Sequence, residues 1–109
     1  MRDEVPGRFL DLMAARFAAL ADPTRVAGIH ALMTKGEQHV GAIVEAVEST
    51  HANVSNHLRV LREAGLVARR KDGMQVYYRL DDPVVRKICE LVCESLVGEF
   101  ESEGDEEPC

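Results

Sequence analysis

The pattern that most restricts the fold of this 109-residue chain lies between residues 40 and 80. Two segments with helical spacing of apolar residues, about 40–48 and 51–64, are separated only by Ser49-Thr50. This pair offers a stop for the first helix and an N-cap for the second. Gly65 then supplies a residue suited to the left-handed turn that ends a helix. The spacing predicts two helices joined by a tight polar turn, which is a helix-turn-helix.

A β-hairpin is predicted directly after this pair of helices. Segments 66–70 and 75–80 contain the β-branched and aromatic residues that favour strands, and Lys71-Asp72-Gly73-Met74 connects them. Asp-Gly between two such segments is a strong hairpin signal. A hairpin that follows a helix-turn-helix is a wing, so these residues predict a winged helix-turn-helix.

Three further helices complete the predicted order. Helical spacing covers residues 8–20 and 23–34 and begins again after Asp82. Asp22-Pro23 and Asp82-Pro83 each place a carboxylate that can cap a helix before a proline suited to its first turn. We therefore expect a mainly α fold with a β-hairpin wing, in the order α-α-α-α-β-β-α.

Charge is distributed unevenly along the chain. The net charge is −6, from 13 basic and 19 acidic residues, but six of the acids lie in residues 99–109. Without them the body is neutral, and residues 51–79 carry six bases against two acids. We therefore expect a DNA-binding and dimerisation domain at 1–98 and an acidic, flexible tail at 99–109. A local charge of +4 on a neutral body favours contact with duplex DNA.

Two stretches of the sequence, FAALADPTRVAGIHAL (17–32) and VSNHLRVLREAGLVARRKDGMQVYYRL (54–80), are typical of one known family. Through them the chain resembles the ArsR–SmtB family of bacterial winged-helix repressors over about residues 9–97. It implies a homodimer in which the first and last helices pair across a two-fold axis, and in which each subunit reads one half-site of an operator. It also implies a repressor that leaves DNA when a metal, a metalloid or an oxidant binds.

The candidate DNA-binding residues belong to the start of helix 51–64 and to the wing. A helix N-terminus offers unpaired N–H groups to phosphate, and Asn side chains suit adenine in the major groove. The residues expected to read bases are His51, Asn53, Ser55 and Asn56, beside Thr50 at the cap. His57 and Arg59 are expected to orient the helix or contact phosphate. The residues expected to meet the DNA backbone or minor groove are Arg69, Arg70, Lys71 and Gln75. The alternative for each single residue is a solvated polar surface.

The cysteines are the candidate effector site. Two metal sites that the resemblance implies are absent, because His39 and Gly41 stand where one needs thiols, and Pro83-Val84 follows Asp82 where another needs histidine. Cys89 and Cys93 are four residues apart on the last helix and therefore neighbours on one side of it. With Cys109 they would offer three thiols to arsenite or another thiophilic ion. No cofactor is required.

Several alternatives remain open for these cysteines. The same thiols suit a repressor that responds to oxidants or sulfide, and the absence of any cysteine sensor is also possible because buried cysteine often serves as a small apolar residue. A bond between Cys89 and Cys93 within an intact helix is disfavoured, since helical neighbours lie too far apart.

Other function classes are disfavoured. An enzyme is not expected, since no activated nucleophile or phosphate-binding loop occurs. A winged helix used only for protein contacts conflicts with the basic segment. The absence of a long apolar run and of a leader pattern, together with an odd number of cysteines, predicts a cytoplasmic protein with reduced thiols that does not enter membranes.

Overall fold

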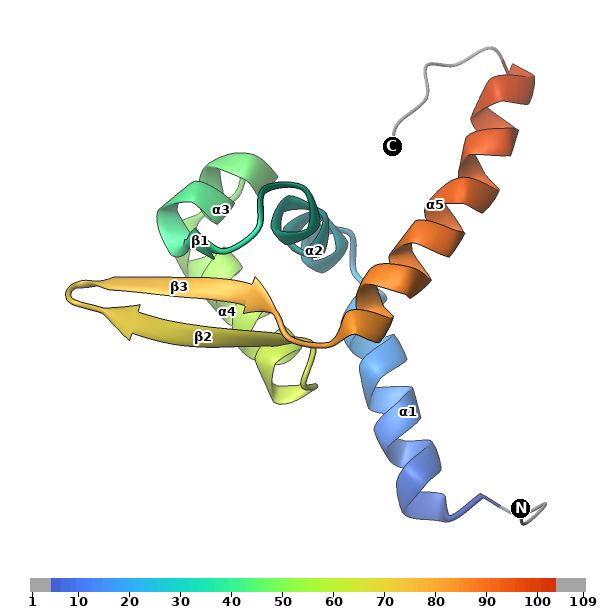
Figure 1. Cartoon of the computed structure of the whole chain (residues 1–109), viewed down its shortest axis with the longest axis horizontal. Coiled ribbons are helices and arrows are strands. Elements are labelled where there is room, and N and C mark those ends of the chain that lie inside the picture. Colours follow the sequence, from blue (N-terminus) through green and yellow to red (C-terminus); the bar gives the residue numbers. More distant parts are fainter. Residues whose placement is uncertain (1–4, 104–109) are drawn as a thin grey trace.

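The computed structural model describes residues 5–103 and contains five helices and a small sheet within them (Figure 1). The predicted winged helix-turn-helix is confirmed. The elements in chain order are α1 (Gly7–Leu20), α2 (Pro23–Lys35), β1 (Gln38–His39), α3 (Val40–Val47), α4 (His51–Glu63), β2 (Val67–Asp72), β3 (Gln75–Leu80) and α5 (Pro83–Glu103).

The helix boundaries follow the capping residues of the sequence. The Asp22 carboxylate accepts a hydrogen bond from the backbone N–H of Arg25 at 3.0 Å, directly before Pro23 opens α2. Thr50 caps α4 in the same way, accepting from the backbone N–H of Asn53 at 3.1 Å. Gly65 follows α4 with a φ of +80°, a conformation that favours glycine. Local chemistry therefore sets where α2 and α4 begin and where the chain turns into the hairpin.

The sheet differs from the predicted hairpin in two ways. A third strand, β1, pairs with β3, so the strand order is β1-β3-β2 and the predicted element order lacked one strand. Two residues are too short to show the alternating pattern of a strand. The hairpin itself is longer than predicted, since Asp72 pairs with Gln75 and only Gly73-Met74 connects the strands. Gly73 has a φ of +62°, which suits the first position of a two-residue turn.

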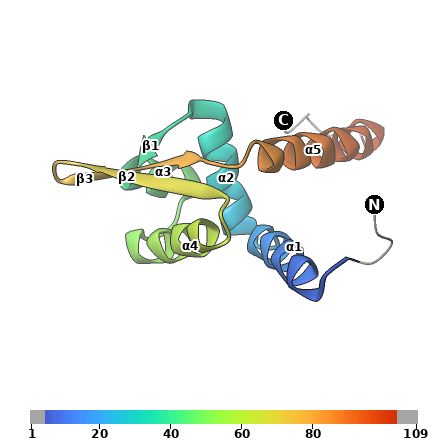
Figure 2. The same cartoon turned by 60° about the horizontal axis from the view of Figure 1, so that its bottom comes forward.

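The hydrophobic core joins α2, α3, α4 and the base of the hairpin. Its most buried side chains are Ile29, Leu32, Ile43, Val54, Leu58, Leu61, Leu66, Val67 and Tyr78. Helices α1 and α5 contribute little to it, with Ala19 and Val85 as their fully buried residues. Figures 1 and 2 show both helices on the side of the molecule opposite the hairpin tip. The apolar side chains of these two helices are therefore mostly exposed in a single chain.

The last helix passes the predicted domain boundary without a break. Helix α5 continues through Gly98 to Glu103, so the boundary expected at residue 98 falls inside a helix. A single glycine within a helix costs about 1 kcal/mol relative to alanine, which does not end a helix of this length. Residues 104–109 lie outside the described part of the chain, and the flexible acidic tail stays a prediction. Among residues 5–103, no helix is long and apolar enough to cross a membrane.

The cap of α2 makes the first testable prediction. Asp22→Ala should lower the free energy of unfolding measurably, because the N–H group that Asp22 satisfies loses its acceptor. Asp22→Asn keeps an acceptor and is the matched control. Urea unfolding at one protein concentration measures both. An equal loss in the two variants would show that the cap is not the source of the stability.

The same carboxylate makes this contribution depend on pH. The backbone N–H of Arg25 lowers the pKa of Asp22 below its ordinary value. A group whose pKa is lowered by folding stabilises the protein above its unfolded pKa and loses that effect as the pH falls through its folded pKa. The advantage of the wild type over Asp22→Asn should therefore shrink as the pH falls below about 4.

Candidate nucleic-acid interface

Helix α4 has one apolar and one polar side. Val54, Leu58 and Leu61 are buried in the core, at the spacing of one helical face. Thr50, His51, Asn53 and Asn56 are exposed near the start of the helix, and Ser55 is half-buried. The buried side holds the helix while its polar N-terminal turns face solvent. This is the arrangement that a helix needs to enter the major groove of DNA.

The polar side chains of α4 are ordered by short-range contacts. The Asn53 amide donates to the hydroxyl of Ser49 at 2.8 Å, and the Nδ1 atom of His51 lies 3.4 Å from the Ser55 hydroxyl. On the next turns, Arg59 donates to the Asn56 carbonyl oxygen at 2.7 Å and pairs with Glu63 at 2.8 Å. These contacts are solvent-exposed and therefore weak enough to exchange for contacts with DNA.

The two faces of the hairpin carry its bases in different environments. Arg69 pairs in register with the buried Tyr78, whereas Arg70 pairs with Tyr77 on the opposite face. The Arg70 guanidinium donates to the Glu37 carboxylate at 2.7 and 3.0 Å and lies 4.6 Å from the centre of the Tyr77 ring. This hydrogen bond lowers the pKa of Glu37. Arg70 is therefore held by the protein itself, while Arg69 and Lys71 share the other face.

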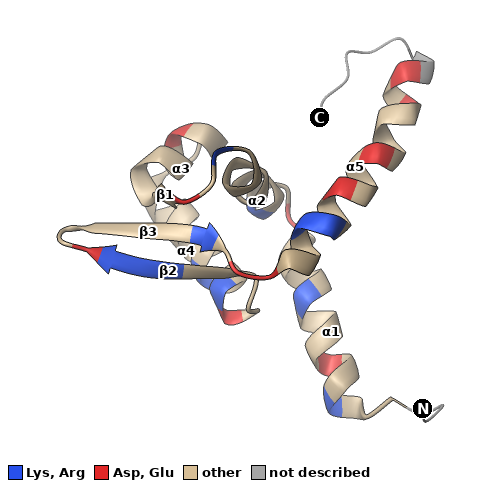
Figure 3. Ribbon diagram, in the orientation of Figure 1, with Lys and Arg blue, Asp and Glu red and all other residues tan. Residues whose placement is uncertain are grey.

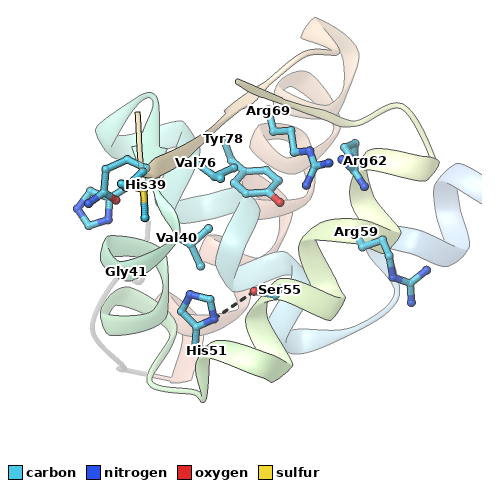
Figure 4. Close-up of a pocket in the computed structure, with 12 residues that line it drawn as sticks. His39, Val40, Gly41, His51, Ser55, Arg59, Arg62, Arg69, Val76 and Tyr78 are labelled. Carbon is cyan, nitrogen blue, oxygen red and sulfur yellow. Dashed lines mark hydrogen bonds between the residues drawn. The ribbon is translucent and has the colours of Figure 1, made fainter. Parts of the chain in front are cut away.

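A groove of about 630 Å³ lies between α4 and that second face of the hairpin (Figure 4). Its polar lining residues are His39, His51, Ser55, Arg59, Arg62, Arg69 and Gln75. In Figure 4 the side chains of Arg62 and Arg69 extend toward one another from α4 and the hairpin. None of the described residues that line the groove is acidic. Three arginines in one concave surface make it suited to phosphate.

Among the arginines of this groove, Arg62 is the one that was not predicted to contact DNA. It lies three residues after Arg59 on α4, a spacing that places two side chains on neighbouring parts of a helix surface. That spacing was the available signal. The register of the hairpin against α4, which brings Arg69 to the same groove, has no signal in the sequence.

His57 points away from the groove. Its Nδ1 atom lies 3.1 Å from the guanidinium of Arg25 and 3.8 Å from the Asp22 carboxylate, at the junction of α1 and α2. Of the two roles expected for His57, this position favours orientation of the helix over contact with phosphate.

Charge is separated across the molecule. Figure 3 shows Lys and Arg on α4, β2 and the end of β3, and Asp and Glu along the later turns of α5. The net charge of −6 therefore says little about the groove. The acidic residues of α5 lie away from the basic surface and leave it able to attract an anionic partner.

The predicted thiol site is only partly within the described residues. Cys89 is a free, half-buried thiol packed against the core, and burial raises its pKa. Cys93 lies one turn later on α5 and takes part in a disulfide bond, so the prediction of a reduced thiol is wrong for this residue. Cys109 lies outside the described part of the chain. Within residues 5–103, no group of three His, Cys, Asp or Glu side chains is placed to hold a metal ion.

Comparison with known proteins identifies what this arrangement resembles. The model of the bacterial regulatory protein family arsR matches residues 22–69, which span α2 to the first part of β2. The arsenical resistance operon repressor of Bacillus subtilis is 31% identical over 107 residues, which are 98% of this chain and 99% of that protein.

Two further proteins extend the comparison. A cadmium resistance transcriptional regulatory protein, a CadC homolog of Staphylococcus aureus, is 41% identical over 72% of this chain, which spans only 64% of that protein's length. A solution structure from Mycobacterium bovis, a homodimeric winged helix-turn-helix DNA-binding domain, is 29% identical with a TM-score of 0.75 and covers 97% of both chains.

The two faces of the hairpin make a prediction about salt dependence. Arg69→Ala and Lys71→Ala should each weaken binding to duplex DNA and reduce the slope of log affinity against log salt concentration by about one. Arg70→Ala is the matched control and should change the slope less, because Arg70 lies on the other face of the hairpin and does not line the groove. Fluorescence anisotropy at several salt concentrations measures the slopes. A larger effect at Arg70 than at Arg69 would place the opposite face of the hairpin against DNA.

Proposed function

This chain belongs to the ArsR family of bacterial regulatory proteins, and from that premise we propose that it represses transcription as a dimer that an effector ion releases from an operator. It is a DNA-binding transcriptional regulator rather than an enzyme, because its relatives are transcriptional regulators and its fold is the winged helix-turn-helix of a DNA-binding domain. The observation that carries the proposal is the groove in which α4 and the hairpin bring Arg59, Arg62 and Arg69 together.

We assign the reading of DNA bases to the polar side of α4. His51, Asn53, Ser55 and Asn56 are the proposed base-reading residues, with Thr50 setting the start of the helix. Asn offers both a donor and an acceptor, the pair that adenine presents in the major groove. Arg59, Arg62, Arg69, Lys71 and Gln75 are the proposed contacts to the DNA backbone. Phosphate contacts position the protein, and base contacts specify the sequence.

We assign dimerisation to α1 and α5. Phe9, Leu12 and Phe17 of α1 are each more than half exposed in a single chain, and Leu91 of α5 is 66% exposed. Exposed apolar surface of this extent usually marks an interface. The homodimeric relative of the same fold supports a second copy of this chain as the partner. Pairing through these helices would direct two hairpins and two α4 helices to successive half-sites.

We assign effector binding to Cys89 and Cys93 after reduction of the disulfide bond of Cys93, with Cys109 or a thiol of the second subunit as the third ligand. Thiolates prefer soft ions, and relatives of this chain are named for resistance to arsenicals and cadmium. Both cysteines lie on α5, so a bound ion would act on the helix that we assign to the dimer. A change in the angle between the subunits would alter the spacing of the two α4 helices. Response of the same thiols to oxidants or sulfide is the second candidate.

The proposed function is tested by fluorescence anisotropy of the reduced protein on the duplex upstream of its own gene. Binding should be salt-dependent and at least about tenfold tighter than to a scrambled duplex of the same length. Arsenite titrated at fixed salt should then release the DNA. Equal affinity for both duplexes would contradict repression at this operator, whereas specific binding that ignores arsenite would contradict only the metalloid response.

The cysteine assignment has its own variants. Cys89→Ser combined with Cys93→Ser should retain DNA binding and lose the release by arsenite. Cys109→Ser tests the third ligand separately. If the double variant still left DNA on addition of arsenite, the assigned site would be wrong.

The buried thiol also predicts a pH dependence for Cd²⁺. Because burial raises the pKa of Cys89, this thiol is protonated at neutral pH and must lose its proton to bind the ion. Affinity for Cd²⁺ should therefore rise by about tenfold per pH unit for each thiol that loses a proton, between about pH 6 and 8. Cys89→Ser should reduce this dependence by about one proton in calorimetric titrations. An unchanged dependence would remove Cys89 from the ligands.

A further inference from the structure

The side chain of Arg25, on the first turns of α2, connects two helices other than its own. Its Nε atom donates to the backbone carbonyl of Ala19 at 2.6 Å, and Nη2 donates to that of Ala18 at 3.3 Å. Both carbonyls belong to the last turn of α1, where helical N–H donors run out, and the Ala18 carbonyl also accepts from the N–H of Ala21 at 3.1 Å. Arg25 therefore caps the C-terminus of α1 with its side chain.

The third contact of Arg25 reaches the helix that faces DNA. Nη1 lies 3.1 Å from Nδ1 of His57 on α4, and both side chains are partly buried. Guanidinium is always a donor, so Nδ1 of His57 must accept and the imidazole proton must sit on Nε2. The carboxylate of Asp22, which caps α2, lies 3.8 Å from the same nitrogen and balances the charge of Arg25.

This chain of contacts constrains α4 in a way that its apolar packing does not. Val54, Leu58 and Leu61 fix the side of α4 that faces the core, but apolar burial has no preferred direction. A hydrogen bond is directional. The bond between Arg25 and His57 therefore limits rotation of α4 about its axis, and that rotation decides where Asn53 and Asn56 present their amides.

We propose that Arg25 is a positioning residue that fixes the recognition helix α4 relative to α1 through His57. The inference rests on the proposed function, because it assigns α1 to the dimer and α4 to DNA. A dimer of fixed geometry then presents its two α4 helices in fixed orientations. The loss of this contact lowers the preference for the correct sequence and leaves the attraction to phosphate in place.

The test compares two duplexes. The first is the sequence that the wild-type protein selects most tightly from a random pool, and the second is a scrambled duplex of equal composition. Arg25→Ala and His57→Leu should each lower affinity for the selected duplex by about tenfold, the effect of one directional hydrogen bond, and leave affinity for the scrambled duplex unchanged. The double variant should lose no more than Arg25→Ala alone, because that change already removes the contact with His57.

A rescue variant separates positioning from packing. His57→Asn places an amide oxygen close to the position of Nδ1, so it can accept from Arg25 and should restore most of the preference for the selected duplex. Leucine at this position has no acceptor. Arg86→Ala is the matched control, since Arg86 also donates to a carbonyl near a helix end, Met33 at 3.3 Å, without contacting α4. It should bind both duplexes as the wild type does.

Three results would overturn the inference. The first is additive losses in the double variant, and the second is an Asn variant that behaves like Leu. The third is equal loss on both duplexes with a smaller salt slope, which would show that His57 contacts phosphate directly. If Arg25→Ala does not fold, the comparison of His57→Leu with His57→Asn still tests the inference. A wild-type protein that selects no sequence would instead overturn the proposed function, and this inference with it.

Discussion

The burial of one side of α4 against α2 and α3 is the interaction on which the rest of the structure depends. Val54, Leu58 and Leu61 pack into a core with Ile29 and Ile43, and each fully buried aliphatic side chain of this kind contributes about 1.5–3 kcal/mol. The same spacing leaves polar residues on the opposite side. One constraint therefore both folds the domain and presents the helix that we assign to DNA.

The hairpin shows how alternation in a strand divides a basic run into two functions. Arg69 and Arg70 are adjacent in sequence and identical in charge, and both are predicted from the sequence to contact DNA. Side chains alternate across a strand, so Arg69 lines the groove while Arg70 pairs with Glu37 and stacks on Tyr77. The pairing of β1 with β3 brings Glu37 close to the hairpin, and that short strand was not predicted.

For helices α1 and α5, the sequence predicted the elements but not what their apolar sides contact. Their apolar spacing predicted helices correctly. An apolar stripe along a helix shows that one side is apolar, but it does not show which partner covers that side. In a single chain Phe17 and Leu91 are more than half exposed, so the stripe is free for a second copy. Cys89 follows the same pattern, since its place in the stripe suited both packing and ion binding, and its burial leaves both roles available.

The sequence by itself determined the local elements of this protein, because caps, glycines and apolar spacing act over a few residues. Asp22-Pro23, Thr50 and Gly65 lie where the sequence placed them, and the family resemblance of residues 54–80 agrees with the fold. Only the tertiary structure decided which charges meet. Arg62 and Arg69 line the same groove, and His57 contacts Arg25 instead of facing that groove. Each of these arrangements brings together residues that are far apart in the chain. The spacing of residues within one helix or strand does not predict how another element is oriented against it.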